Sequence, residues 1–199
     1  PCGLGWSSFA VVGSRLFTQE QIEELEAVVC YDPDTGRELW RHTDRTRLDT
    51  SLGGDGPRAT PTFFEGRLYA LGGTGLLHCL DAITGEVIWK TDILADAGIN
   101  SIVDAAIDWG MSGSPLVDDE RVYVNPGVSR SHPGQQSVAA YDRKTGKKLW
   151  ANGDTKAGYA APRPVTWDGV RQRLIFDAAE VAGYEPDTGR KLWSFPFSN

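Results

Sequence analysis

Tyr31-Asp-Pro-Asp-Thr-Gly-Arg-Glu-Leu-Trp40 is the most informative stretch of this chain, because close copies of it stand at three further places. The copies are Leu80-Asp-Ala-Ile-Thr-Gly-Glu-Val-Ile-Trp89, Tyr141-Asp-Arg-Lys-Thr-Gly-Lys-Lys-Leu-Trp150 and Tyr184-Glu-Pro-Asp-Thr-Gly-Arg-Lys-Leu-Trp193. An acid, a Thr-Gly pair and a Trp recur at the same offsets in every copy. Self-similarity of this kind indicates one structural unit repeated along the chain.

Each copy predicts a β-hairpin. A β-rich run such as 27–31 leads into an Asp-x-x-Thr-Gly turn, and an alternating run such as 37–40 leads out of it. The acid can accept backbone N–H groups in an Asx-turn, and the glycine supplies the positive φ that closes such a turn. The acids, glycines and tryptophans of the four copies are Asp32, Gly36, Trp40, Asp81, Gly85, Trp89, Asp142, Gly146, Trp150, Glu185, Gly189 and Trp193.

A second pair of expected strands precedes each hairpin, at 7–13 with 15–19, 59–66 with 67–72, 113–119 with 121–125, and 161–167 with 172–177. Four strands per unit is the count of a propeller blade, and the spacing of the tryptophans brackets the roughly 40 to 50 residues of such blades. We therefore predict an all-β fold, a β-propeller with four blades of four antiparallel strands. The single region spans 1–199, with blades at approximately 6–43, 58–93, 111–153 and 159–197 and an insertion near 100–109.

The repeats also act as an internal alignment. Two positions before the turn acid, all four copies carry a small residue: Cys30, Cys79, Ala140 and Gly183. A small residue there and an indole ten positions later predict that each Trp lies across a gap where large side chains are excluded, between neighbouring blades.

The repeated Ala-x-Asp-x-x-Thr-Gly-x-x-x-Trp pattern resembles the tryptophan-docking motif of pyrroloquinoline quinone (PQQ) type β-propeller repeats, at 30–40, 79–89, 140–150 and 183–193. The departures are Cys, Cys and Gly in place of Ala, and Glu185 in place of Asp. The resemblance covers nearly the whole chain and implies half of an eight-bladed PQQ-like propeller.

Two groups with different functions share this repeat. Quinoprotein alcohol dehydrogenases hold the quinone with calcium on the axis of the propeller, whereas the lipoprotein scaffold of the bacterial outer-membrane barrel-assembly machinery has no cofactor. The leading hypothesis that the resemblance supports is a non-enzymatic scaffold for protein interactions, without cofactor, in the bacterial periplasm or cell envelope. The alternative is a cofactor-binding fragment of a PQQ-dependent alcohol or sugar dehydrogenase, with PQQ and calcium. A sensor or carbohydrate-binding propeller is a third reading that no residue selects.

The net charge of the chain limits the classes of molecule that it is expected to bind. The formal charge of −7 argues against nucleic acid or an anionic membrane surface as the main partner. No apolar run is long enough for a transmembrane segment. An open arc of blades would expose the faces of its terminal blades, so we expect association with other proteins, including a second copy that completes an eight-bladed ring.

The mouth of the propeller axis is the place where a ligand is expected. Aligning the expected innermost strands puts Trp6, Arg58, Ser112 and Tyr159 at one equivalent position, and the long loops 44–57 and 96–110, the latter with Trp109, would cover it. Two aromatic rings, a guanidinium and a hydroxyl can hold a planar anionic ligand. The same residues can equally be polar strand ends that fill the channel or touch further blades.

Other motifs point to structure rather than chemistry. The resemblance implies that an active quinone dehydrogenase would typically show an adjacent Cys-Cys pair, a catalytic Asp near the axis and calcium ligands of Glu and Asn type. This chain has no adjacent Cys pair, and the only candidate carboxylates near a blade entrance are Asp55 and Asp108. Asp32-x-Asp34-x-Gly36 predicts a turn rather than a calcium loop. His42, His78 and His132 stand in separate units without ligand spacing, so we expect no metal site and no catalytic residues.

Two further expectations concern local structure. The acidic stretch 19–26 predicts an extended hairpin turn, or a short helix, whose four glutamates (Glu20, Glu23, Glu24 and Glu26) form a solvated tip. The three cysteines, Cys2, Cys30 and Cys79, are expected to be buried free thiols, because equivalent positions in adjacent blades stand too far apart for a disulfide.

Overall fold

The computed structural model describes residues 2–50, 53–129, 134 and 136–197 of the chain. The first sheet contains β1 (Ala10–Val12), β2 (Arg15–Ile22), β3 (Leu25–Tyr31) and β4 (Glu38–Asp44). The second contains β5 (Thr62–Phe64), β6 (Arg67–Leu71), β7 (Leu76–Asp81) and β8 (Val87–Asp92). The third contains β9 (Leu116–Val117), β10 (Arg121–Val124), β11 (Val138–Asp142) and β12 (Lys148–Asn152). The fourth contains β13 (Arg163–Trp167), β14 (Val170–Phe176), β15 (Glu180–Tyr184) and β16 (Lys191–Pro196).

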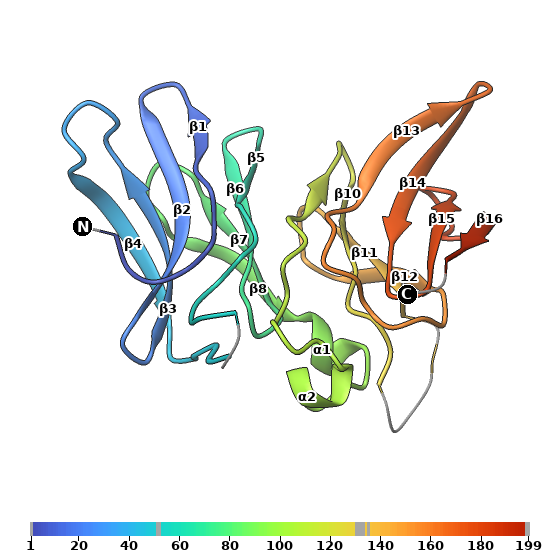
Figure 1. Cartoon of the computed structure of the whole chain (residues 1–199). Coiled ribbons are helices and arrows are strands. Elements are labelled where there is room, and N and C mark those ends of the chain that lie inside the picture. Colours follow the sequence, from blue (N-terminus) through green and yellow to red (C-terminus); the bar gives the residue numbers. More distant parts are fainter. Residues whose placement is uncertain (1, 51–52, 130–133, 135, 198–199) are drawn as a thin grey trace.

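The four sheets form a propeller-like array. Within each sheet the strands pair antiparallel in chain order, so each sheet is a four-stranded meander. The short strands β1, β5 and β9 contact one another in succession and lie on the inner side of the array. Figure 1 places the first sheet, in blue, and the fourth, in orange and red, at opposite ends of an arc. The prediction of an all-β fold with four blades of four antiparallel strands is confirmed.

The repeated turn forms as the sequence predicts. Asp32 Oδ1 accepts hydrogen bonds from the backbone N–H of Asp34 at 3.1 Å and of Thr35 at 2.8 Å, and from the Thr35 hydroxyl at 2.7 Å. Asp81 and Asp142 make the same set of bonds in the second and third sheets. Glu185 instead accepts from the Thr188 hydroxyl. The first acid of each copy therefore shapes the turn.

The tryptophans that end the first three copies of the motif each contact the following sheet. The indole N–H groups donate to backbone carbonyls there: Trp40 to Ala82 at 3.3 Å, Trp89 to Arg143 at 3.0 Å and Trp150 to Pro186 at 3.2 Å. The small residues predicted to leave room pair directly opposite the indoles, as Cys30 with Trp40 and Ala140 with Trp150. In the structure, Trp40, Trp89 and Trp150 therefore lie at the interfaces between neighbouring sheets.

The glycine of the repeated turn meets two demands at once. Gly146 has a φ of +71°, and a Cβ atom there would lie 2.6 Å from the Trp89 ring of the preceding sheet. Gly85 and Gly189 meet Trp40 and Trp150 in the same way. Side chains longer than hydrogen are therefore excluded by backbone conformation and by the indole that lies on the turn.

The core sits between neighbouring sheets. One cluster joins the first two sheets through residues such as Phe17, Cys30 and Leu80, and another joins the third and fourth through residues such as Ile175 and Tyr184. The largest cluster lies between the second and third sheets and extends into the insertion that follows β8. The array is therefore stabilised by successive blade interfaces, as in other repeat proteins.

The insertion after β8 contains two short helices, α1 (Ile93–Asp96) and α2 (Ile102–Ala105). Asp92 caps α1 by accepting from the N–H groups of Leu94 and Ala95, and Ser101 caps α2. Ile93 and Ile107 are buried against the largest core cluster. Among the described residues, no helix is both long and apolar enough to cross a membrane.

Two local expectations are wrong. The acidic stretch is neither an extended turn nor a helix, because β2 runs to Ile22 and β3 begins at Leu25. Glu20 is only 3% exposed and accepts from the Tyr31 hydroxyl at 2.7 Å, and Glu26 is also buried, so only Glu23 and Glu24 are solvated. Each glutamate belongs to a run of five consecutive buried residues, 17–21 on β2 and 26–30 on β3, because both faces of these strands are covered. Of the three free thiols, Cys30 and Cys79 are buried as expected, but Cys2 is exposed.

Candidate functional site

A cavity of about 370 Å³ lies at the inner side of the array. Its lining comprises all five residues that the sequence analysis selected, together with Gly53: Trp6, Arg58, Trp109, Ser112 and Tyr159. Four of them precede the first strand of their sheets, Trp6 before β1, Arg58 before β5, Ser112 before β9 and Tyr159 before β13. The repeat itself therefore brings them to one place. The long loops that were expected to cover this place contribute Gly53 and Trp109.

Arg58 ties the two long loops together. Its Nε donates to the Trp109 carbonyl at 2.6 Å, and one terminal nitrogen donates to Thr50 Oγ1 at 2.9 Å and to the Gly54 carbonyl at 3.1 Å. The other terminal nitrogen, NH1, is buried and has no hydrogen-bond partner among the residues that the structure describes. A buried, unpaired guanidinium N–H favours an acceptor that comes from outside this part of the chain.

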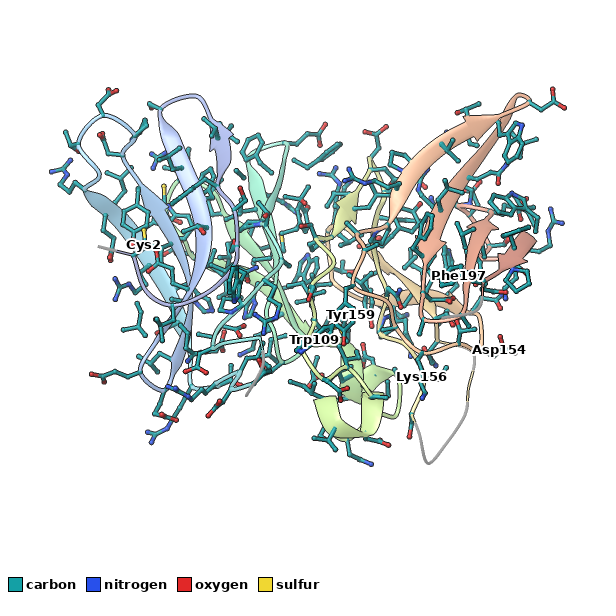
Figure 2. The ribbon with its side chains drawn as sticks, viewed as in Figure 1. Cys2, Trp109, Asp154, Lys156, Tyr159 and Phe197 are labelled. Carbon is teal, nitrogen blue, oxygen red and sulfur yellow. The ribbon has the colours of Figure 1, made fainter. Side chains whose placement is uncertain are left out.

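Aromatic rings form the remaining wall. Trp109 and Tyr159 lie close together at the centre of the molecule, beside the insertion (Figure 2), with ring centroids 5.1 Å apart. The Trp6 indole donates to the Gly53 carbonyl at 2.7 Å but remains 69% exposed. Burial lowers the pKa of Arg58 and raises that of Tyr159. Both directions have the same cause, which is the loss of water around these side chains.

The two carboxylates singled out from the sequence lie outside this wall. Asp55 Oδ2 is 2.5 Å from a terminal nitrogen of Arg47 and forms a salt bridge with it. Asp108 lines a neighbouring cavity of about 510 Å³, which shares Trp109 with the first. The lining of the 370 Å³ cavity thus includes no carboxylate.

The cavity can hold a planar anion between aromatic faces and a guanidinium, which matches the quinone of the dehydrogenases that the sequence resembles. The described residues of its lining do not match calcium, because Ca²⁺ takes six to eight oxygen ligands and the only side-chain hydroxyls among these residues are those of Ser112 and Tyr159. The chemistry of the described lining is thus compatible with a planar quinone but lacks the oxygen ligands that calcium requires.

The sequence analysis missed a second cluster. His42 on β4 and His78 on β7 were expected to lie apart, yet their ring centroids are 5.0 Å apart and both approach Asp44. The repeat could have predicted this proximity. Trp40 contacts the following sheet, so His42, two residues later on β4, is expected to lie close to that sheet as well. His132, the third histidine, lies outside the described residues.

Comparison with known proteins points to one fold and two functions. The family profile described as outer membrane protein assembly factor BamB matches residues 25–199. A curated relative, polyvinylalcohol dehydrogenase from a Pseudomonas species, is 28% identical over 162 residues, which cover 66% of this chain and 24% of the relative.

Solved structures share the fold at low identity. BamB from Moraxella catarrhalis aligns with a TM-score of 0.65 and 18% identity, covering 94% of this chain and 50% of BamB. The quinohemoprotein alcohol dehydrogenase ADHIIG from Pseudomonas putida HK5 aligns with a TM-score of 0.62 and 16% identity, covering 98% of this chain and 34% of the enzyme. The chain therefore spans half or less of the length of these relatives.

Proposed function

Because this chain belongs to the PQQ-like repeat family described as outer membrane protein assembly factor BamB, we propose that it is a non-enzymatic propeller scaffold for protein interactions in the bacterial envelope. Its terminal blades bind further PQQ-like blades, and a second copy of the chain is the partner to which we commit. This proposal rests on one observation. Inside the array, the tryptophan of each blade packs on the Thr-Gly turn of the next blade, but the first turn and the last tryptophan have no such partner within the described part of the chain.

At the first blade the receiving turn is uncovered. Gly36 has a φ of +65°, like its counterparts, but a Cβ atom there would meet no described atom within 4 Å. At Gly85, Gly146 and Gly189 a Trp ring of the preceding blade lies 2.3 to 2.6 Å from that position. The first blade thus has the shape of a receptor for an indole.

At the last blade the indole has no following turn. Trp193 donates instead to Gln172 Oε1 of its own sheet at 2.6 Å, and its ring lies edge-on to Trp167 at 5.8 Å. Around it is a cavity of about 640 Å³ whose lining includes Trp167, Val170 and Phe195, each at least half exposed. Exposed apolar surface of this kind marks an interaction site.

A second copy supplies what each end requires. Trp193 of one copy would lie on the Gly36 turn of the other, and a two-fold axis would repeat the contact at the opposite pair of ends. Eight blades would then close without an exposed terminal face. The formal charge of −7 favours proteins over nucleic acid as partners.

The mass in solution tests the pairing. We expect sedimentation velocity at micromolar concentration to detect a dimer, and Trp193→Ala to raise the dissociation constant at least tenfold. Trp109→Ala is the control, because Trp109 is an exposed tryptophan that lies in the insertion, away from both ends. A monomer at tens of micromolar would contradict pairing with a second copy, and equal dimerisation of the Trp193 variant would contradict the proposed contact.

Quinone binding is the second candidate function, and the aromatic cavity with its buried Arg58 NH1 favours it. The relative named polyvinylalcohol dehydrogenase adds support. Bound PQQ would supply redox chemistry, while Arg58 would pair with a carboxylate and the rings of Trp109 and Tyr159 would stack on the quinone.

A titration with PQQ tests this candidate, followed through the fluorescence of the seven tryptophans. Saturable quenching in wild type, weakened at least tenfold by Arg58→Ala, would support a quinone site. Arg41→Ala is the control, because Arg41 pairs with Glu38 on the outer strand and does not line the cavity. Calcium in one arm of the titration measures whether the metal contributes. Quenching that is equal in both variants would exclude the proposed cavity.

A further inference from the structure

Three side chains from the first two sheets meet, two from β4 and one from β7. Figure 1 shows these two sheets, in blue and in teal to green, as neighbours. His42 Nε2 lies 3.1 Å and His78 Nε2 lies 2.7 Å from the same carboxylate oxygen, Asp44 Oδ2. The potential ligand atoms of the three residues all lie within 4.8 Å of one another. Two imidazoles and a carboxylate are a donor set typical of zinc sites.

The burial of His78 distinguishes this cluster from a chance grouping of exposed side chains. His78 is 4% exposed, and its Nε2, although close to Asp44, lacks hydrogen-bond geometry with any described atom. A buried imidazole nitrogen without such a bond leaves its donor or acceptor capacity unused. It is aimed at the point where the His42 nitrogen and the carboxylate also converge.

We propose that His42, Asp44 and His78 bind a divalent transition-metal ion of the zinc class, which joins the first blade to the second. Tetrahedral coordination with bonds of about 2.0 to 2.2 Å would place the ligand atoms roughly 3.4 Å apart. The two separations from Asp44 Oδ2, 3.1 and 2.7 Å, are shorter than this, and all ligand atoms lie within 4.8 Å of one another, so metal binding would require the side chains to rotate. The fourth position remains for water.

The charges around the cluster allow a cation. Lys90 Nζ lies 2.7 Å from Asp44 Oδ1, the oxygen that the histidines do not approach. It can therefore hold the carboxylate from outside while Oδ2 binds the ion, as hydrogen-bonded partners of metal ligands commonly do. Lys90 is part-exposed, so water weakens its repulsion of the ion. Buried Glu26 lies opposite Asp44 in the pairing of β3 with β4.

Binding of Zn²⁺ and Co²⁺ to the whole chain tests the proposal. The measurements use chelator-treated Cys2→Ser protein, because the exposed thiol of Cys2 would itself attract zinc. We expect calorimetry to detect one Zn²⁺ per chain with a micromolar or lower dissociation constant, and Co²⁺ to give the visible absorption of a tetrahedral site.

Variants assign the ligands. We expect His78→Gln and His42→Gln each to weaken Zn²⁺ binding at least tenfold, while His132→Gln, the third histidine, leaves it unchanged. His42 lies nearer the surface than His78, so its variant keeps the test open if the His78 variant fails to fold. Absence of stoichiometric binding by the Cys2→Ser protein would overturn the proposal, as would equal affinity of the folded His42 variant.

Discussion

Glu26 is a carboxyl group in an unusual position, because its side chain is buried on β3 with 7% exposure and accepts from the Gly73 N–H at 3.1 Å. Burial raises the pKa of Glu26 from 4.5 to about 7, and the nearby Asp44 carboxylate acts in the same direction. The folded chain therefore holds a proton that the unfolded chain releases between these two pKa values. The resulting stabilisation is complete below about pH 4.5 and is lost as the pH rises through 7.

Replacement of Glu26 by Gln keeps a neutral group in its place at every pH. We expect Glu26→Gln to be more stable than wild type at pH 8 by about 1 to 3 kcal/mol, and the difference to shrink at pH 5. Urea unfolding at both pH values, with a chelator present, measures this. Glu86→Gln, at an exposed position, controls for the loss of one negative charge. An unchanged difference between pH 5 and pH 8 would contradict the interpretation.

The glycine of the repeated turn adopts a positive φ and also leaves room for the tryptophan of the preceding sheet. Gly36 and Gly146 allow these two roles to be measured separately. Gly146 and Gly36 share a positive φ, but only Gly146 lies beneath a Trp ring of a preceding sheet. Alanine at either position would suffer backbone strain. Alanine at 146 must also displace Trp89, which is 8% exposed and bonded to the Arg143 carbonyl.

We therefore expect Gly146→Ala to lower the free energy of unfolding by about 1 to 3 kcal/mol more than Gly36→Ala, the additional cost of an overpacked contact. Chemical unfolding at submicromolar concentration measures the difference, because association at the Gly36 turn is then negligible. Equal effects at the two positions would mean that the indole does not constrain the turn. The comparison tests the blade interface without removing a tryptophan.

The array has two inner blades, each packed between two neighbouring blades, and two terminal blades, each packed against only one. Stability in such molecules depends on contacts between neighbouring repeats, so a terminal blade has one interface fewer than an inner blade. We expect amide hydrogen exchange at low concentration to be slower in the second and third sheets than in the first and fourth.

Raising the protein concentration tests the pairing of ends. We expect exchange in residues 33–36 and in β16 to slow as the concentration rises, because a second copy covers the Gly36 turn and Trp193. Trp193→Ala should remove this dependence on concentration. Hydrogen exchange measured by mass spectrometry at a low and a high protein concentration tests this. Equal exchange rates at both concentrations would argue against closure of the ring by a second copy.

Local patterns account for most of the secondary structure. The acid, Thr-Gly and Trp of each copy specify a hairpin through hydrogen bonds within a few residues, such as those of Asp32. Because the unit is repeated in phase, equivalent positions must converge, and the gathering of Trp6, Arg58, Ser112 and Tyr159 around one cavity follows from that symmetry. The same logic placed Trp40, Trp89 and Trp150 between blades.

Contacts between different blades lay beyond local patterns. Glu20 and Glu26 occur in an acidic stretch that reads as solvated, yet pairing with neighbouring strands and loops buries both. His42 and His78 belong to different repeats, and only the packing of β4 against the second sheet brings their rings together at Asp44. A repeat therefore determines its own turn and strands in the sequence, because those bonds are short-range. Which side chains become buried or meet across an interface depends on how whole sheets pack.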